Sequence, residues 1–164
     1  MGKRKIIWFL AIFLMAIFVL LISPTGKYQV LCAEDISQPT EEIIIATMVN
    51  NIRNDNGIEN LCWDETLAQI AKIRAKDMIE SHYFGHWNPE GKTVFDQWKI
   101  RSKYRGENLA RGHPPEYVTP ERVVSAFLQS ESHKKNLLRK VYRKIGVGIE
   151  ITEEEKIVVL VFTN

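Results

Sequence analysis

Three short segments of the chain carry side chains that could bind a ligand or transfer a proton. The first, HYFGHWNPEG, begins at His82, the second, GENLA, begins at Gly106, and the third, SESHKKNLL, begins at Ser130. They supply two imidazoles, a carboxylate and two amides from separate parts of a small domain. Polar groups that converge in this way build binding and catalytic clefts. We therefore expect one cleft to which all three segments contribute.

His86, Glu107 and His133 are the main candidates for chemistry. Two imidazoles and one carboxylate match a three-ligand zinc site with an open position, in which His86 and His133 would be the imidazole ligands. The same groups can serve as general acid, base and orienting residue in hydrolysis. A structural role is the alternative for each: Glu107 as a buried acid bonded to loop amides, and His133 as an exposed residue in the first turn of a short helix.

The pair His82 and His86 does not fit a zinc-protease helix. That motif requires a glutamate directly after the first histidine, and Tyr83 occupies the position here. Both histidines would also have to lie on one helical face, whereas Gly85 is predicted to break the helix between them. The sequence therefore argues against a metalloprotease.

The N-terminus predicts export from the cytoplasm. Residues 1–33 are predicted to be a signal peptide or an N-terminal membrane anchor, because Lys3, Arg4 and Lys5 precede an uncharged apolar stretch over 6–22. Either alternative places the rest of the chain outside, as a secreted protein or as a domain anchored to the membrane. Residues 34–40 are predicted to be a linker, and 41–164 a single domain.

The charge pattern argues against nucleic acid as a partner. After residue 33 the chain has 18 Lys and Arg against 20 Asp and Glu, which gives no general attraction to polyanions. One basic run can bind an anionic cell-wall polymer or lipid headgroups, with a solvated surface as the alternative. It comprises Lys134, Lys135, Arg139, Lys140, Arg143 and Lys144. Only Cys62 remains in the domain, so no disulfide can form within it, and we expect this residue to be buried.

Periodicity predicts helices first and paired strands last. Helices are expected at 41–54, from the cap Asp64 to about Gly85, at 94–100, from the cap Thr119, and from the cap Ser132 to Leu138. His82 would then lie in the last turn of the second helix. Residues 145–151 alternate in polarity and 157–162 are continuously apolar, which predicts a hairpin. This order is typical of an α+β fold with helices packed over an antiparallel sheet.

The motifs, in this order and spacing, resemble the bacterial branch of the CAP superfamily. This group includes cysteine-rich secretory proteins, insect venom allergens and plant pathogenesis-related proteins. The resemblance covers 41–164 and rests on LAQIAKIRAKDMIESHYFGHWNPEGKTVFDQW, GENLA, AFLQSESHKKNLL and KIGVGIEI. It implies a three-layer α-β-α sandwich with a central antiparallel sheet, and a cleft lined by two histidines and two acids.

By this resemblance His86 and His133 correspond to the two cleft histidines, and Glu107 to the acid of the GEN motif. The residues expected to support the cleft are Asn108, Ser130 and Asn136. Ser130 stands where animal and plant members usually have glutamate. The resemblance therefore implies an incomplete version of the four-residue acid–base or metal centre.

We expect an extracytoplasmic CAP-domain protein that acts as a binding module, whose cleft accepts a divalent metal such as zinc, a lipid or a cell-wall ligand. The alternative is a secreted hydrolase of peptide or ester bonds, with His86 or His133 as base and Glu107 as the orienting residue. No serine or cysteine lies in a nucleophile motif such as Gly-x-Ser-x-Gly. This favours binding over hydrolysis.

Overall fold

The computed structural model describes residues 39–164. The predicted signal peptide or anchor in residues 1–33, with its apolar stretch 6–22, lies outside the described residues, as does most of the linker 34–40. Within 39–164, no helix combines the length and the apolar character needed to cross a bilayer.

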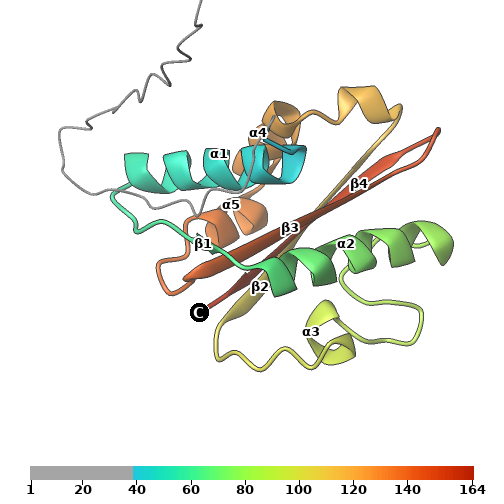
Figure 1. Cartoon of the computed structure of the whole chain (residues 1–164), viewed down its shortest axis with the longest axis horizontal. Helices are drawn as coiled ribbons and strands as arrows, with labels where there is room; N and C mark the ends of the chain where they lie inside the picture. The colour runs from blue at the N-terminus through green and yellow to red at the C-terminus, as the bar shows by residue number, and fades with distance from the viewer. Residues whose placement is uncertain (1–38) are drawn as a thin grey trace, which may run out of the picture. The chain divides into compact units, whose positions relative to one another are not determined.

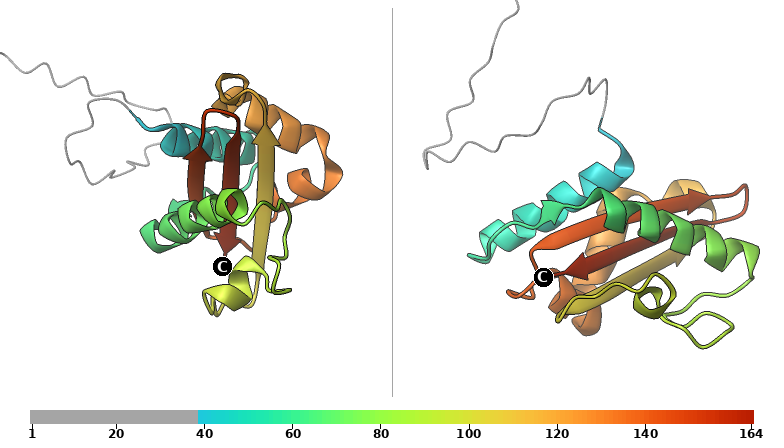
Figure 2. Two further views of the ribbon diagram at one scale, coloured as in Figure 1. Left: turned by 90° about the vertical axis from the view of Figure 1, so that its right-hand side faces the viewer. Right: turned by 60° about the horizontal axis from the view of Figure 1, so that its bottom comes forward.

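The described chain forms three layers around one sheet. The helices are α1 (Glu41–Asp55), α2 (Glu65–Glu80), α3 (Val94–Gln97), α4 (Pro120–Gln129) and α5 (Glu131–Leu137), with a 3-10 turn at Pro115–Tyr117. The strands are β1 (Cys62–Trp63), β2 (Arg105–Gly112), β3 (Lys144–Ile151) and β4 (Lys156–Thr163). Helices α1, α4 and α5 cover one face of the sheet, and α2 and α3 cover the other (Figures 1 and 2). The three-layer α-β-α sandwich is thus confirmed.

The sheet has the strand order β1-β3-β4-β2. Strands β3, β4 and β2 are antiparallel, as expected, while the two-residue β1 pairs parallel with β3 and makes the sheet mixed. The hairpin predicted at the end of the chain forms β3 and β4. Val159 and Val161 in β4 have no exposed surface, because β4 is flanked by two strands and covered on both faces. A continuously apolar strand is the pattern expected for such a position.

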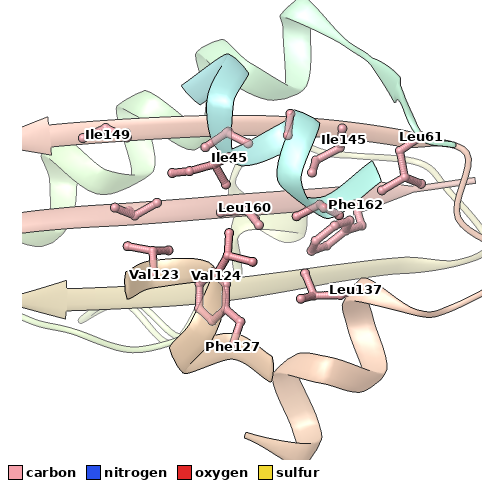
Figure 3. Close-up of a cluster of buried hydrophobic side chains, with 14 of the residues drawn as sticks. Ile45, Leu61, Val123, Val124, Phe127, Leu137, Ile145, Ile149, Leu160 and Phe162 are labelled. Carbon is pink, nitrogen blue, oxygen red and sulfur yellow. The ribbon is translucent and has the colours of Figure 1, made fainter. Parts of the chain in front are cut away.

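Two apolar clusters fill the space between the layers. On one face, Ile45 of α1 and Phe127 of α4 pack with Leu160 and Phe162 of the sheet (Figure 3). On the other face, residues of α2 and α3 pack against Leu109 and alternate residues of β4. The two clusters fix the helices on the sheet, and therefore also fix the loops that carry the cleft residues.

Several predicted helix limits are wrong by a few residues. Helix α2 begins at its predicted cap, Asp64, but ends at Glu80, and His82 lies beyond it with a φ of 51°. His82 therefore takes the left-handed conformation that often follows a helix, rather than a place in the last turn. Helix α3 ends at Gln97 instead of Ile100, and the residue that caps α5 is Ser130, not Ser132.

Two strands and one burial state were not predicted. GENLA lies inside β2, where the sequence predicts no strand, since glycine, glutamate and asparagine are uncommon in strands. The short β1 was missed as well. Cys62 in β1 is exposed rather than buried, since the strand is at the edge of the sheet.

Candidate functional site

Strand β2 places two polar residues of the GEN motif on opposite faces of the sheet. Successive side chains of a strand alternate between faces, so Glu107 contacts α2, whereas Asn108 contacts α5. Both side chains are buried. Because β2 is an edge strand, segments from both outer layers can meet along it.

His86 and Glu107 form the central pair of the candidate site. The Nδ1 atom of His86 lies 2.7 Å from Oε2 of Glu107. The carboxylate side chain is only 3% exposed, while the imidazole is 45% exposed. A carboxylate that accepts the Nδ1 proton of a neutral histidine fixes the tautomer and leaves the Nε2 lone pair free. His86 is thus arranged to bind a metal ion or a proton at Nε2.

Arg74 of α2 lies directly beneath this pair and is fully buried. Its Nε atom is 3.4 Å from Oε1 of Glu107. Within the described chain, neither of these two atoms has a well-directed hydrogen bond, so each depends on the opposite charge of the other. The guanidinium balances the charge that Glu107 would otherwise carry alone in the interior.

Arg74 also holds the loop that carries His86. Its two terminal nitrogens donate to the hydroxyl of Tyr83, at 2.6 Å, and to the carbonyl of Gly85, at 3.0 Å. The Tyr83 hydroxyl donates in turn to Asp77, at 2.5 Å. Burial, followed by the hydrogen bond to Asp77, raises the pKa of Tyr83 well above its usual value. Tyr83 therefore stays protonated, and this chain of contacts fixes the backbone next to His86.

Two amides connect β2 to the helix that carries His133. Asn108 donates to the backbone carbonyl of His133 at 3.1 Å, and Asn136 donates to the Asn108 side chain at 2.8 Å. Asn136 also lies 3.3 Å from the carbonyl oxygen of Glu107. Both amides therefore position the start of α5 rather than face a ligand directly.

His133 occupies the other side of the same region. Its half-buried ring packs on Phe127, with 5.0 Å between ring centroids. Burial, and then the charge of His86, lower the pKa of His133 below its usual value. His133 is therefore neutral near pH 7, and its pKa depends in part on the charge of His86.

We predict that His133 titrates below the ordinary histidine pKa of about 6.5, and that His86→Ala raises its pKa. The reason is that the variant removes the positive charge that opposes protonation of His133. NMR titration of the ring protons measures both values, and His113→Ala, at an exposed histidine remote from Phe127, is the matched control. A pKa of His133 that is identical in the parent and in His86→Ala would contradict the proximity of the two rings.

Two expectations about the site fit the structure less well, namely the supporting role of Ser130 and a metal site with three protein ligands. The Ser130 hydroxyl lies 3.2 Å from that of Ser132, and no bond joins it to His133 or Glu107 in the described part of the chain. In residues 39–164, no group of three or more His, Cys, Asp and Glu side chains is arranged to hold a metal ion. Glu107 is already engaged by Arg74 and His86, so a metal would find two imidazoles rather than three protein ligands.

Two surface hollows lie away from these residues. One of about 430 Å³ is lined by α4 residues such as Arg122 and Ser125, and one of about 360 Å³ by Ile79, His82 and the β3–β4 turn. Neither contains His86, Glu107 or His133. The candidate site therefore rests on the geometry of its polar side chains and not on cavity size.

Arg74 is the site residue that sequence reasoning missed. The apolar stripe of α2 includes Ile70, Ala71 and Met78, and Arg74 occupies the position between them at helical spacing. A charged residue on the buried stripe of a helix is seldom unpaired. This interruption was the available signal that a buried carboxylate had to lie opposite α2.

Comparison with known proteins gives a consistent picture. The model of the CAP family, the cysteine-rich secretory protein family, matches residues 46–162. The uncharacterized protein YkwD of Bacillus subtilis (strain 168) is 38% identical over 107 residues, which are 63% of this chain and 40% of that protein. The present chain thus spans well under half the length of this curated relative.

Two solved structures of bacterial proteins are also similar. An extracellular protein containing an SCP domain from Bacillus anthracis str. Ames has a TM-score of 0.65 and 27% identity. The match covers 76% of this chain and 40% of that chain. An outer surface protein of Borrelia burgdorferi has a TM-score of 0.66 and 28% identity, covering 74% of this chain and 90% of its own. Both likenesses extend over most of the described residues.

Proposed function

The chain belongs to the cysteine-rich secretory protein (CAP) family, and from this premise we propose that it is an extracytoplasmic binding module whose cleft holds a divalent cation, with zinc as the test ion. The observation that carries the proposal is the 2.7 Å contact between Glu107 and Nδ1 of His86. This contact leaves Nε2 of His86 as a free, oriented ligand atom. A lipid or a cell-wall ligand would then bind either to this ion or directly to the cleft.

The protonation state of His133 supports the same proposal. A metal ion binds neutral imidazole, so a histidine with a lowered pKa competes less with protons for the metal. Burial and the neighbouring His86 lower the pKa of His133 in this direction. Two imidazoles and solvent would complete a weak and exchangeable site, because structural zinc sites normally have four protein ligands.

We predict that zinc binds the full-length protein with modest affinity, and that His86→Ala and His133→Ala each weaken binding by at least about tenfold, a typical loss for altered metal surroundings. Calorimetry with zinc, on protein purified in an uncharged detergent, gives the affinity. Binding should also weaken as the pH falls through the range in which the histidines take up protons.

The controls for this experiment are in the chain itself. His82→Ala and His113→Ala remove exposed histidines that do not contact Glu107, so both variants should bind zinc as the parent does. Glu107→Gln should weaken binding, because the amide supports the Nδ1 proton of His86 less strongly than a carboxylate does. Undiminished binding in either His86→Ala or His133→Ala would place the ion elsewhere.

A hydrolase is the second candidate, and the same Glu107–His86 pair favours it. An imidazole oriented by a carboxylate is the usual form of a general base. No hydroxyl or thiol hydrogen-bonds to either imidazole ring within residues 39–164, so water would have to be the nucleophile. Hydrolysis of peptide or ester substrates that His86→Ala abolishes, without any zinc binding by the parent, would favour this candidate.

The relatives support a location of the domain outside the cytoplasm. The similar proteins of Bacillus anthracis and Borrelia burgdorferi are described as extracellular and as an outer surface protein, respectively. Together with the basic and apolar N-terminus, this supports a domain outside the cytoplasm. We propose that it is either secreted or anchored to the membrane through residues 6–22.

A further inference from the structure

Seven exposed Lys and Arg residues gather at the end of the sheet where β2 and β3 begin and β4 ends. We call this surface the basic end, and its members are Arg101, Lys103, Arg105, Arg139, Lys140, Arg143 and Lys144. They come from the α3–β2 link with the first residue of β2, and from the α5–β3 link with the first residue of β3. The guanidinium of Arg139 lies 5.7 Å from the ring centroid of Tyr104, which joins the two links.

The sheet fixes the spacing of two of these cations. Arg105 in β2 and Lys144 in β3 both pair with Thr163 of β4, one on each side. Two strand spacings separate them, which is about 9–10 Å. Along the α3–β2 link, Arg101, Lys103 and Arg105 are exposed, whereas the intervening Ser102 and Tyr104 are half-buried and bonded to Asn164. The three cations of this stretch are therefore open to solvent, whereas the residues between them are fixed to the end of the chain.

Few carboxylates neutralise the basic end. Arg143 contacts Glu59 at 3.5 Å and Lys144 contacts Asp64 at 2.9 Å. Hydrogen bonds from Thr93 are the main cause of the lowered pKa of Asp96, and the charge of Arg105 adds to it. Four members have no carboxylate contact within the described residues, namely Arg101, Lys103, Arg139 and Lys140. The basic end therefore carries an excess of positive charge.

The corresponding negative charge lies at the other end of the sheet. Residues 39–164 contain 18 Lys and Arg and 18 Asp and Glu, so the described domain has no formal net charge. Glu153, Glu154 and Glu155 lie at the β3–β4 turn, one strand length away from Lys144. Eight strand residues span about 26 Å, which exceeds the Debye length at physiological ionic strength, about 8 Å. The two ends thus act as separate charged surfaces.

We propose that the basic end binds a linear anionic polymer, for which polyphosphate is the test polymer. Several cations from two adjacent links fit a chain with repeated charges better than a single ion. A membrane surface fits less well, because stable membrane docking also needs a broad apolar face. The large exposed apolar residues are Ile43, Ile73, Phe84, Trp87, Tyr117, Val141 and Ile151. Of these, only Val141 lies between members of the basic end.

Contacts within the protein already order some side chains of the basic end. The Arg139 guanidinium lies 5.3 Å from the Tyr142 ring as well as 5.7 Å from that of Tyr104. Arg143 donates to the carbonyl of Lys140 at 2.6 Å. Side chains that are already ordered lose less conformational freedom on binding. The proposal does not depend on what the His86–Glu107 cleft binds.

Full-length protein in an uncharged detergent would be titrated with long-chain sodium polyphosphate at several salt concentrations. The informative variant is Arg101→Glu with Lys140→Glu, because both side chains are exposed and neither forms an ion pair within the described residues. The matched control is Lys72→Glu with Lys76→Glu, two exposed lysines on α2. Thermal melts of both variants would establish that they are folded.

We expect the parent to bind polyphosphate and the double variant at the basic end to bind at least tenfold more weakly. The dependence of log affinity on log salt should also become shallower by about 1.4 or more, because each of the two substituted cations that neutralises a phosphate accounts for about 0.7 of the slope. The control variant should bind nearly as the parent does.

Three results would overturn the proposal. One is the absence of polyphosphate binding by the parent at low salt, and another is equal affinity in the parent and in the double variant at the basic end. The third is binding to vesicles of phosphatidylglycerol and phosphatidylcholine without binding to polyphosphate, which would assign the surface to a membrane. A parallel variant, Lys134→Glu with Lys135→Glu, tests whether the lysines of α5 extend the surface.

Discussion

Arg74→Met is expected to destabilise the domain by about 3–5 kcal/mol, the usual cost of removing one partner from a buried ion pair. The methionine fills similar volume but leaves the Glu107 carboxylate, 3% exposed, without the guanidinium that faces it at 3.4 Å. It also removes the donors to Tyr83 and Gly85. Equilibrium unfolding in urea, monitored by tryptophan fluorescence, measures the loss of stability.

A substitution of Glu107, the partner of Arg74, tests the cause of this loss of stability. If the cost arises from an uncompensated charge, the double variant Arg74→Met with Glu107→Gln should be more stable than the sum of the single effects implies, since contacting residues couple by roughly 0.5–3 kcal/mol. The more exposed control is Arg111→Met, because the side chain of Arg111 is 40% exposed in its ion pair with Glu155, which is 16% exposed. Surface pairs contribute about 0–1 kcal/mol.

An equal loss of stability in Arg111→Met and Arg74→Met would show that burial of the Arg74–Glu107 pair is unimportant. The two variants should also differ at the site. Arg74→Met should reduce zinc binding, because the loop that carries His86 loses its anchor at Gly85. Arg111→Met should leave zinc binding unchanged.

The elements with strong local signals were predictable from sequence. Asp64 and Thr119 cap α2 and α4 as expected, since a side-chain oxygen before an apolar helical repeat satisfies the free amides. The continuously apolar run of β4 likewise predicts a strand covered on both faces. These features depend on neighbours in the chain, and a single sequence contains that information.

Strand β2 could not be predicted because its conformation depends on contacts with residues that are distant in the sequence. Gly106 lies where a Cβ atom would meet the Tyr142 hydroxyl and the Asn136 side chain. Glu107 and Asn108 are buried only because Arg74 and Asn136 lie opposite them. A polar, glycine-containing strand has low intrinsic propensity, and tertiary contacts decide its conformation. For the same reason, the prediction of a cleft named the histidines but not the arginine beneath them.

The basic end shows that the sequence also predicts the distribution of surface charge only in part. Lys140, Arg143 and Lys144 were visible as one run in the sequence, whereas Arg101 and Lys103 join them only through the fold. Contacts such as the one between Arg139 and Tyr104 connect residues that are far apart along the chain. A charge pattern read along the sequence therefore described only part of the surface.

Gly148→Ala is expected to be one of the most destabilising single-methyl additions in the domain. Helix α2 crosses β3 so closely that a Cβ on Gly148 would lie less than 3.0 Å from backbone atoms of Ala71 and Lys72. Backbone atoms of a helix cannot move aside as a flexible side chain can, so α2 has to shift on the sheet. We expect a loss of about 3 kcal/mol or more, at the upper end of overpacking costs.

Gly85→Ala is the matched control, because only the carbonyl oxygen of Trp87, at 4.0 Å, lies near the added methyl group. Its effect should stay within about 1 kcal/mol and can be stabilising, since alanine restricts the unfolded chain. Urea unfolding of the two variants compares the same chemical change at a tight and at an open position. Because α2 carries Arg74, a shift of the helix in Gly148→Ala should also separate Arg74 from Glu107 and weaken zinc binding. Parent-like stability of Gly148→Ala would mean that α2 does not lie against β3 at this distance, and the placement of Arg74 beneath the cleft would then be wrong as well.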